Sequence, residues 1–271
     1  MSKHALLRLA LVIATAALTA FLYFSPKTNL APARSKTNIV DFGFLLEKAK
    51  QKLQRQEIST LSEMENLLKE KSGDEKVSVL NSLAARWDGS GEPAIAAGYF
   101  EQAAEINPSE KYRVAAADRY FAAMRNATDS TELLWLLNRA IENYKSESEI
   151  NPDNTDAKIN LAICYTETSN PMNGIMILRE VVQQHPDNLK AQMNLGLLSI
   201  RSGQFDKAIE RFKKVIEIDP GGGEAYYFLG YSYMKKGENA DALDYFNQYT
   251  ETGKDTQLIN EANVYIRQLK P

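Results

Sequence analysis

The sequence is poor in the residues that build disulfides, zinc sites and histidine-based catalysis. It has one cysteine among its 271 residues, Cys164, so no disulfide can form within the chain. It has two histidines, His4 and His185. This set leaves no room for a zinc site with the usual nitrogen and sulfur ligands, or for a histidine-based triad. We therefore predict no metal site, no cofactor and no catalytic residue.

Positive charge is scarce outside the N-terminal stretch. Residues 1–36 carry five basic residues and no acidic one: Lys3, Arg8, Lys27, Arg34 and Lys36. The rest of the chain holds the other 27 of the 32 basic residues against all 35 acidic residues, a formal net charge of −8. A body this acidic repels phosphate backbones, which argues against nucleic-acid binding.

One long apolar run stands near the start of the chain. Residues 5–24 are apolar except for Arg8, Thr15 and Thr19. A helix of this length rises about 30 Å, the thickness of a bilayer core, so we predict a membrane anchor in residues 1–25. A cleaved signal peptide is the alternative and would give a secreted protein. The short tail before the run favours an orientation with the body outside the cytoplasm.

The next two segments differ in their apolar pattern. Residues 26–38 contain two prolines and no periodic apolar pattern, which predicts a flexible linker. In residues 39–76 apolar residues recur at helical spacing, which predicts a leading pair of helices. Thr60 and Glu63 have the spacing of a capping box, so the second helix is expected to start at Thr60. This pair is a degenerate repeat or a leading cap.

Three prolines mark an internal repeat. Pro152, Pro186 and Pro220 lie 34 residues apart, and the residues between them recur in register. A period of this length is the signature of stacked repeats. We predict five repeats, at residues 77–110, 111–154, 155–188, 189–222 and 223–254, followed by a capping helix at 255–271. The second copy is longer because of an insertion around residues 124–134, where Asp129 and Glu132 are expected to cap a lengthened helix.

The recurring positions explain how such repeats pack. Leu195-Gly196, Gly203, Ala208 and Phe212 in one copy correspond to Leu229-Gly230, Gly237, Ala242 and Phe246 in the next. Small residues are expected to face each other, so that the two helices of one hairpin approach closely. The expected pairs are Gly196 with Ala208, Gly230 with Ala242, Ala162 with Gly174 and Ala84 with Ala96. The aromatic residues would fill the gap to the next hairpin, and the glycines at 203 and 237 would allow tight turns.

On these residues the chain resembles the tetratricopeptide repeat family over about residues 77–270. The resemblance implies an all-α fold of the tetratricopeptide-type α-solenoid, a right-handed superhelix of helical hairpins, after an N-terminal transmembrane or signal helix. It also implies a scaffold that binds a protein or peptide partner in a concave groove, lined by the first helix of each repeat.

The first helices carry polar and aromatic residues suited to such a groove. Asn160 and Asn194 recur at the repeat period, and their amides can bond a ligand backbone. Tyr227 and Tyr231 form an aromatic strip typical of binding surfaces, with packing beneath the C-terminal helix as an equal alternative. The candidate groove residues are Asn160, Lys190, Met193, Asn194, Leu197, Arg201, Tyr227, Tyr231 and Lys235.

The sequence as a whole predicts a membrane-tethered scaffold with no chemistry of its own. A narrower hypothesis is an envelope assembly or maturation factor. Two alternatives stay open, namely a structural spacer that self-assembles and an enzyme with an unrecognised carboxylate site. We further expect Cys164 to be a buried core residue and His185 to be exposed at a turn between repeats.

Overall fold

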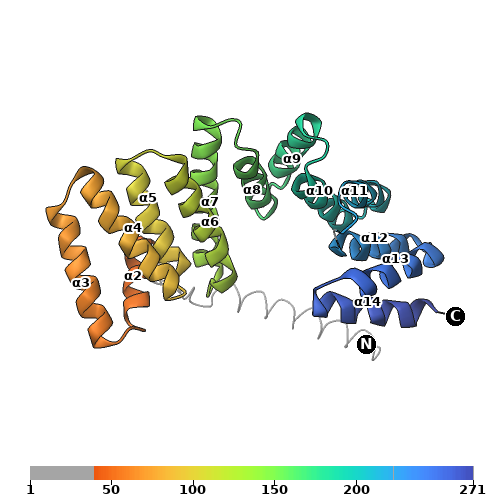
Figure 1. The fold of residues 1–271 in the computed structure, drawn as a ribbon, viewed down its shortest axis with the longest axis horizontal. Helices are drawn as coiled ribbons and strands as arrows, with labels where there is room; N and C mark the ends of the chain where they lie inside the picture. The colour runs from red at the N-terminus through yellow and green to blue at the C-terminus, as the bar shows by residue number, and fades with distance from the viewer. Residues whose placement is uncertain (1–39, 222, 271) are drawn as a thin grey trace, which may run out of the picture. The chain divides into compact units, whose positions relative to one another are not determined.

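The computed structural model describes residues 40–221 and 223–270, and every regular element in these ranges is helical (Figure 1). The predicted all-α class is confirmed for this part of the chain. The α-helices are α2 (Phe42–Lys50), α3 (Arg55–Glu70), α4 (Gly73–Gly89), α5 (Pro93–Ile106), α6 (Glu110–Ala123), α7 (Ser130–Ile150), α8 (Thr155–Thr166), α9 (Met172–Gln184), α10 (Leu189–Arg201), α11 (Phe205–Ile218), α12 (Gly223–Lys236), α13 (Asn239–Thr252) and α14 (Thr256–Leu269).

From α4 onward the helices form a stack of hairpins. The pairs α4–α5, α6–α7, α8–α9, α10–α11 and α12–α13 each pack within the pair and against the next, and α14 packs on α13 (Figure 1). The buried apolar side chains form successive clusters along the stack instead of one central core. This nearest-neighbour packing is the architecture of a repeat solenoid, as predicted.

Glycines shape the turns within the hairpins. Gly203 and Gly237 adopt φ angles of 70° and 82°, and Gly91 adopts 75° at the same place in the first of these hairpins. Side chains with a Cβ rarely take this left-handed conformation, because the Cβ crowds the backbone. The predicted role of Gly203 and Gly237 in tight turns is therefore confirmed.

The close approach of paired helices is only partly as predicted. A Cβ added at Gly174 would overlap the carbonyl oxygen of Ala162, so this predicted pair is in direct contact. At Gly196 the nearest atoms belong to the ring of Phe212, 2.6 Å from where a Cβ would lie, rather than to Ala208. Gly230 meets the ring of Phe246 in the same way, at 3.0 Å, rather than Ala242. The reason is steric: the ring lies over the turn before its own Cα and occupies the space that the glycine leaves.

The same ring connects neighbouring hairpins. Phe212 also stacks on Phe228 of α12, with ring centroids 5.6 Å apart. One aromatic side chain therefore packs both within its own hairpin and against the next.

The predicted start of the second leading helix was wrong. α3 begins at Arg55, and the backbone N–H of Gln54 donates to the Glu57 carboxylate at 2.9 Å. The Thr60 hydroxyl instead donates to the carbonyl of Gln56 inside the helix. A glutamate three residues after a polar residue occurs three times in this stretch, and the earliest copy caps the helix.

The insertion in the second repeat lengthens α7 as predicted. The Asp129 carboxylate accepts from the backbone N–H groups of Thr131 and Glu132 at 2.8 and 2.9 Å and so caps the helix. α7 consequently spans 21 residues and includes Trp135, whose ring meets Tyr120 edge-on at 5.5 Å.

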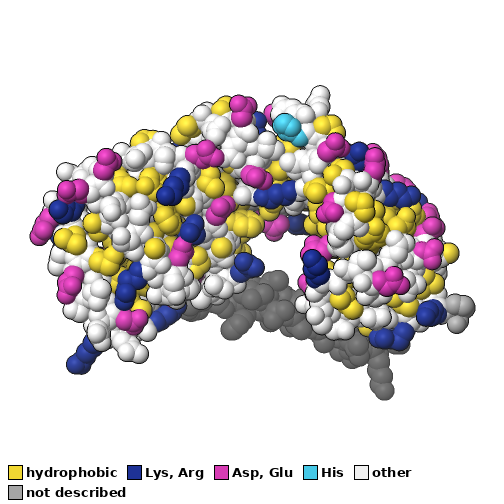
Figure 2. All heavy atoms as spheres, viewed as in Figure 1, with side chains coloured by type: hydrophobic (Ala, Val, Ile, Leu, Met, Phe, Trp, Pro, Cys, Tyr) yellow, Lys and Arg dark blue, Asp and Glu magenta, His cyan; other side chains and the backbone are white. Residues whose placement is uncertain are grey.

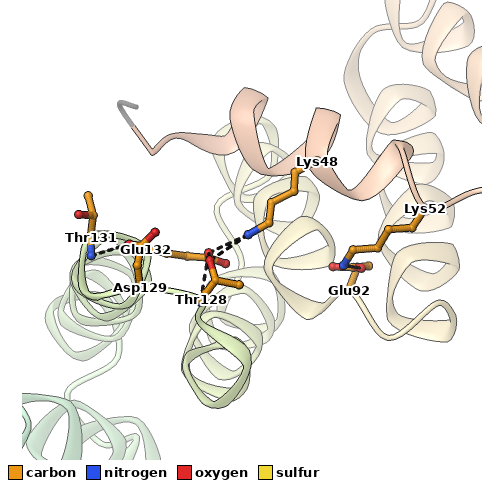
Figure 3. Close-up of polar contacts among 7 residues, drawn as sticks. All are labelled: Lys48, Lys52, Glu92, Thr128, Asp129, Thr131 and Glu132. Atoms are coloured by element: carbon orange, nitrogen blue, oxygen red, sulfur yellow. Dashed lines mark hydrogen bonds and ion pairs between the residues drawn. The ribbon is translucent and has the colours of Figure 1, made fainter. Parts of the chain in front are cut away.

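The short helix α2 lies against α5, whereas α3 packs on α4. Leu45 and Ala49 of α2 are buried, and the Phe42 ring meets Tyr99 edge-on at 5.3 Å. Lys48 of α2 and Lys52, which lies just after α2, reach toward the repeats (Figure 3). Lys48 bonds Glu132 at 3.0 Å and Lys52 bonds Glu92 at 2.5 Å. The inserted segment of the second repeat therefore contacts the leading helix.

The remaining local predictions concern single residues and the membrane segment. Cys164 is buried, and burial raises the pKa of its thiol to about 12. His185 is exposed at the end of α9. Residues 5–24, the predicted anchor, lie outside the described residues. Within residues 40–221 and 223–270, no helix combines the length and apolar character needed to cross a bilayer.

Candidate partner-binding groove

A cavity of about 540 Å³ opens between helices α8, α10, α12 and α14, and is called the groove below. Its walls combine aliphatic and aromatic side chains with a few charged or amide groups. The lining residues are Ile163, Thr166, Glu167, Asn194, Leu197, Leu198, Ile200, Arg201, Tyr227, Phe228, Tyr231, Glu261 and Tyr265. A concave, mostly apolar wall with a few oriented polar groups is typical of ligand sites.

Side chains cap three of the helices that line the groove. The Asn154 side chain accepts from the N–H of Ala157 at 3.0 Å, and Asn188 accepts from Ala191 at 2.9 Å. Asp255 caps α14 similarly, accepting from Leu258 at 3.1 Å. α8 and α10 thus begin 34 residues apart, at Thr155 and Leu189, whereas α14 begins at Thr256, one residue before the position that this period gives.

The groove wall contains positions that recur every 34 residues along the chain. Ile163, Leu197, Tyr231 and Tyr265 occupy one such position on α8, α10, α12 and α14. Arg201 lies 34 residues after Glu167, and its guanidinium bonds that carboxylate at 2.9 Å. The repeat period thus places the apolar side chains in one row and a charged pair in another.

The aromatic end of the groove is ordered by a hydroxyl–carboxylate contact. The Tyr227 hydroxyl donates to the Glu261 carboxylate at 2.8 Å. Burial, followed by this hydrogen bond, raises the pKa of the Tyr227 phenol well above its ordinary value. Tyr231 and Tyr265 lie with ring centroids 6.1 Å apart, and the Lys235 ammonium lies 5.2 Å from the Tyr231 centroid.

The structure brings together part of the predicted groove set. Asn194, Leu197, Arg201, Tyr227 and Tyr231 line the groove. Tyr227 is also 5% exposed, so this side chain both packs in the core and closes one end of the groove.

The other predicted residues lie beside the groove. Lys190 and Met193 line a neighbouring cavity of about 500 Å³. The Lys190 ammonium donates to the Asn160 side-chain oxygen at 2.6 Å, so this amide already has a partner within the chain. The Asn194 amide likewise donates to the carbonyl of Lys190 at 2.7 Å.

Sequence reasoning missed the contribution of the C-terminal helix. It was predicted only as a cap, yet Glu261 and Tyr265 complete the groove. The signal was available, because Glu261 lies 34 residues after Tyr227 and so continues the repeat period. Phe228, which occupies the position of Asn194 in the next repeat, was missed as well.

The surface around these helices carries charges of both signs. On the face seen in Figure 2, acidic and basic side chains are interspersed with hydrophobic ones. That face offers no continuous basic track of the kind that follows a nucleic-acid backbone. Within the described ranges, no group of three or more His, Cys, Asp or Glu side chains is arranged to hold a metal ion.

Comparison with known proteins shows that residues 174–261 are similar to a known repeat family. Two tetratricopeptide repeat models match the chain, at residues 174–222 and 199–261. Comparison with curated proteins gave no match.

Solved structures share the fold. MamA from Desulfovibrio magneticus RS-1 is 19% identical with a TM-score of 0.54, covering 67% of this chain and 97% of that one. TTC0263, a thermophilic tetratricopeptide repeat protein of Thermus thermophilus, is 19% identical with a TM-score of 0.51, covering 70% and 99%. YrrB, described as having an unusual peptide-binding site, is 18% identical with a TM-score of 0.50, covering 74% and 97%.

Proposed function

We propose that this chain, which belongs to the tetratricopeptide repeat family, is a membrane-tethered scaffold that binds a segment of a partner protein in the groove. The observation that carries the proposal is the groove itself, about 540 Å³ with aliphatic and aromatic walls. Rigid aromatic side chains give large contact area at low entropic cost, which suits recognition of a peptide or helix. The relative YrrB has a described peptide-binding site, which supports the same use here.

The chemistry of the groove favours binding over catalysis. The Thr166 hydroxyl donates to the backbone carbonyl of Ile163 at 2.7 Å and is not paired with a base. The raised pKa of Tyr227 keeps its phenol protonated, which is the opposite of what activates a nucleophile. These two hydroxyls therefore act as structural groups, in line with a scaffold.

The membrane tether is the second part of the proposal. The apolar run at residues 5–24 supplies the anchor, and the described repeats form the body, which we place outside the cytoplasm. An envelope assembly or maturation factor is the narrower form of this role. Fractionation of cells expressing the intact chain or a chain lacking residues 1–38 tests it. Recovery of the intact chain in the soluble fraction would contradict the anchor.

Groove binding is tested by crosslinking the intact protein in detergent extracts and identifying its partners. Leu197→Asp places a charge in the apolar row and is expected to remove partners that depend on the groove. Met176→Asp is the matched control, because Met176 lies on α9, does not line the groove and is 61% exposed.

The two variants separate the alternatives. Loss of the same partner in Leu197→Asp alone supports the proposal. An identical partner set in both variants and the parent chain contradicts it. Unchanged partners combined with a smaller assembly on a sizing column would favour the self-assembling spacer.

A further inference from the structure

The end of the groove formed by α12 and α14 contains a carboxylate, Glu261, that forms no ion pair within the described part of the chain. The Glu261 side chain accepts from the Tyr227 hydroxyl at 2.8 Å and from the Gln257 amide at 3.2 Å. Both donors are neutral. Across residues 40–221 and 223–270, no Lys or Arg nitrogen lies within 4.0 Å of this carboxylate. Its negative charge is thus left for a ligand to balance.

Aromatic residues line the same end of the groove as this carboxylate. Tyr227, Phe228, Tyr231 and Tyr265 line the same cavity as Glu261. The faces of such rings carry negative potential and attract cations. The chain itself shows this attraction, because the Lys235 ammonium lies 5.2 Å from the Tyr231 ring centroid.

The other charges in the groove do not cancel that of Glu261. Arg201 also lines the groove, but its guanidinium is paired with Glu167 at 2.9 Å. This pair belongs to α8 and α10, whereas Glu261 belongs to α14. The chain after residue 36 has a net charge of −8, which adds attraction for a cation at longer range.

We infer that this end of the groove binds a lysine or arginine side chain of the partner segment. The cationic group bonds Glu261, and the rings of Tyr231 and Tyr265 cover its methylene stem. An apolar side chain next to it in the partner occupies the row of Ile163 and Leu197. The inference rests on the proposed function, because it names the chemistry of the segment that the groove takes.

The test uses a phage-displayed library of random peptides, selected on the intact chain in detergent. We expect selected peptides to combine a basic residue with a neighbouring apolar one. Synthetic copies are then titrated against the parent chain and Glu261→Gln, with Glu251→Gln on α13 as the control for an exposed carboxylate outside the groove. The amide introduced by Glu261→Gln would still offer an oxygen to the Tyr227 hydroxyl, and thermal melting checks that the fold is kept.

The expected result is about a tenfold weaker affinity for Glu261→Gln and no change for Glu251→Gln. Replacing a lysine of the peptide with norleucine, or an arginine with citrulline, should weaken binding to the parent chain as much as Glu261→Gln does. In Glu261→Gln the same replacement should weaken binding little further, because the basic group of the peptide acts through the Glu261 carboxylate.

Two outcomes would overturn the inference, and they differ in what else they affect. Peptides that lose binding in Leu197→Asp, carry no enriched basic residue and bind Glu261→Gln unchanged would refute it while groove binding stands. Peptide binding that survives Leu197→Asp, or a library that yields no binder, would count against groove binding and the inference together.

Discussion

The ammonium group of Lys48 donates to the Glu132 carboxylate at 3.0 Å, across 84 residues of sequence. Glu132 also accepts from the Thr128 hydroxyl at 2.6 Å, and Lys48 donates to that hydroxyl at 3.1 Å. Thr128 and Glu132 lie in the insertion that lengthens the second repeat. That insertion therefore serves to hold α2, the first described helix, against the repeats.

Removing the lysine should loosen α2. Lys48→Ala is expected to weaken docking of α2 by about 1 kcal/mol or less, because the Lys48 side chain is partly exposed and solvent screens the pair. Hydrogen exchange at Phe42–Lys50 should accelerate while α10–α13 stay unchanged. Lys145→Ala is the control, since Lys145 and Glu149 form an exposed pair at 3.9 Å. Equal exchange in the two variants would contradict a docking role for Lys48.

The contact between Lys48 and Glu132 should also make the docking of α2 weaker at acidic pH. Burial acts to raise the pKa of Glu132, but hydrogen bonds from Thr128 and Lys48 outweigh it and hold the pKa below the ordinary value of 4.5. A depressed carboxyl pKa stabilises the folded state above the unfolded value, and this stabilisation is lost as the pH falls through the folded pKa.

We therefore expect exchange at α2 to rise as the pH is lowered below 4.5, relative to exchange at α10. The ratio of the two rates corrects for the intrinsic pH dependence of exchange. In Glu132→Gln the ratio should be high at neutral pH and vary little with acid. A parent chain whose ratio stays flat from about pH 6 to about pH 3 would exclude this role of Glu132.

A second buried carboxyl, that of Glu147, should make stability depend on pH in the opposite direction. Glu147 of α7 is fully buried, and within residues 40–221 and 223–270 no donor, Asn154 included, has good hydrogen-bond geometry to either carboxylate oxygen. Burial raises the pKa of Glu147, Glu110 of α6 adds to the rise, and Asn154 and Arg113 oppose it. A raised carboxyl pKa means that the folded state binds the proton more tightly, so stability falls as the pH rises above the unfolded value.

Glu147→Gln should consequently stabilise the protein at about pH 7, by on the order of 1 kcal/mol, because it removes the free-energy cost of burying an ionised carboxylate. The gain should vanish below about pH 4, where the carboxyl becomes neutral in both states. Urea denaturation at the two pH values measures it, with exposed Glu149→Gln as the control. A gain that is the same at both pH values would show that ionisation of Glu147 is not its cause.

Gly196 should tolerate no side chain. A Cβ at this position would lie 2.6 Å from the Phe212 ring, which is itself fully buried between two hairpins. Gly196→Ala should lower the free energy of unfolding by about 1–3 kcal/mol through overpacking. Gly89→Ala is the matched control, because a Cβ there meets no atom within 4 Å. Equal stability of the two variants would show that the ring moves aside without cost.

The repeat period made most of the stack predictable. Residues 34 apart take the same place in successive hairpins, so Gly203 and Gly237 were recognisable as turns. The same period extended to Glu261 and Tyr265 would have placed them on the groove wall. In the sequence alone, residues 255–271 show one amphipathic helix, a pattern that predicts a cap and does not by itself indicate a groove wall.

Other features of the structure could not be predicted from local sequence patterns. The contact between Lys48 and Glu132 joins segments far apart in sequence, and lysines and glutamates of this kind occur on many solvated helix faces. The start of α3 was ambiguous because Gln54 with Glu57 and Thr60 with Glu63 both have the spacing of a capping box. In the structure the earlier pair caps the helix, through the backbone N–H of Gln54 and the Glu57 carboxylate.

The burial of Cys164 has a practical consequence. Its thiol is inaccessible and, with a pKa of about 12, supplies almost no thiolate at neutral pH. Because the sequence has no other cysteine, one introduced on the surface would react alone with a maleimide dye. The native background is therefore ready for a fluorescent reporter at a single cysteine introduced on the surface, without replacing any residue of the core.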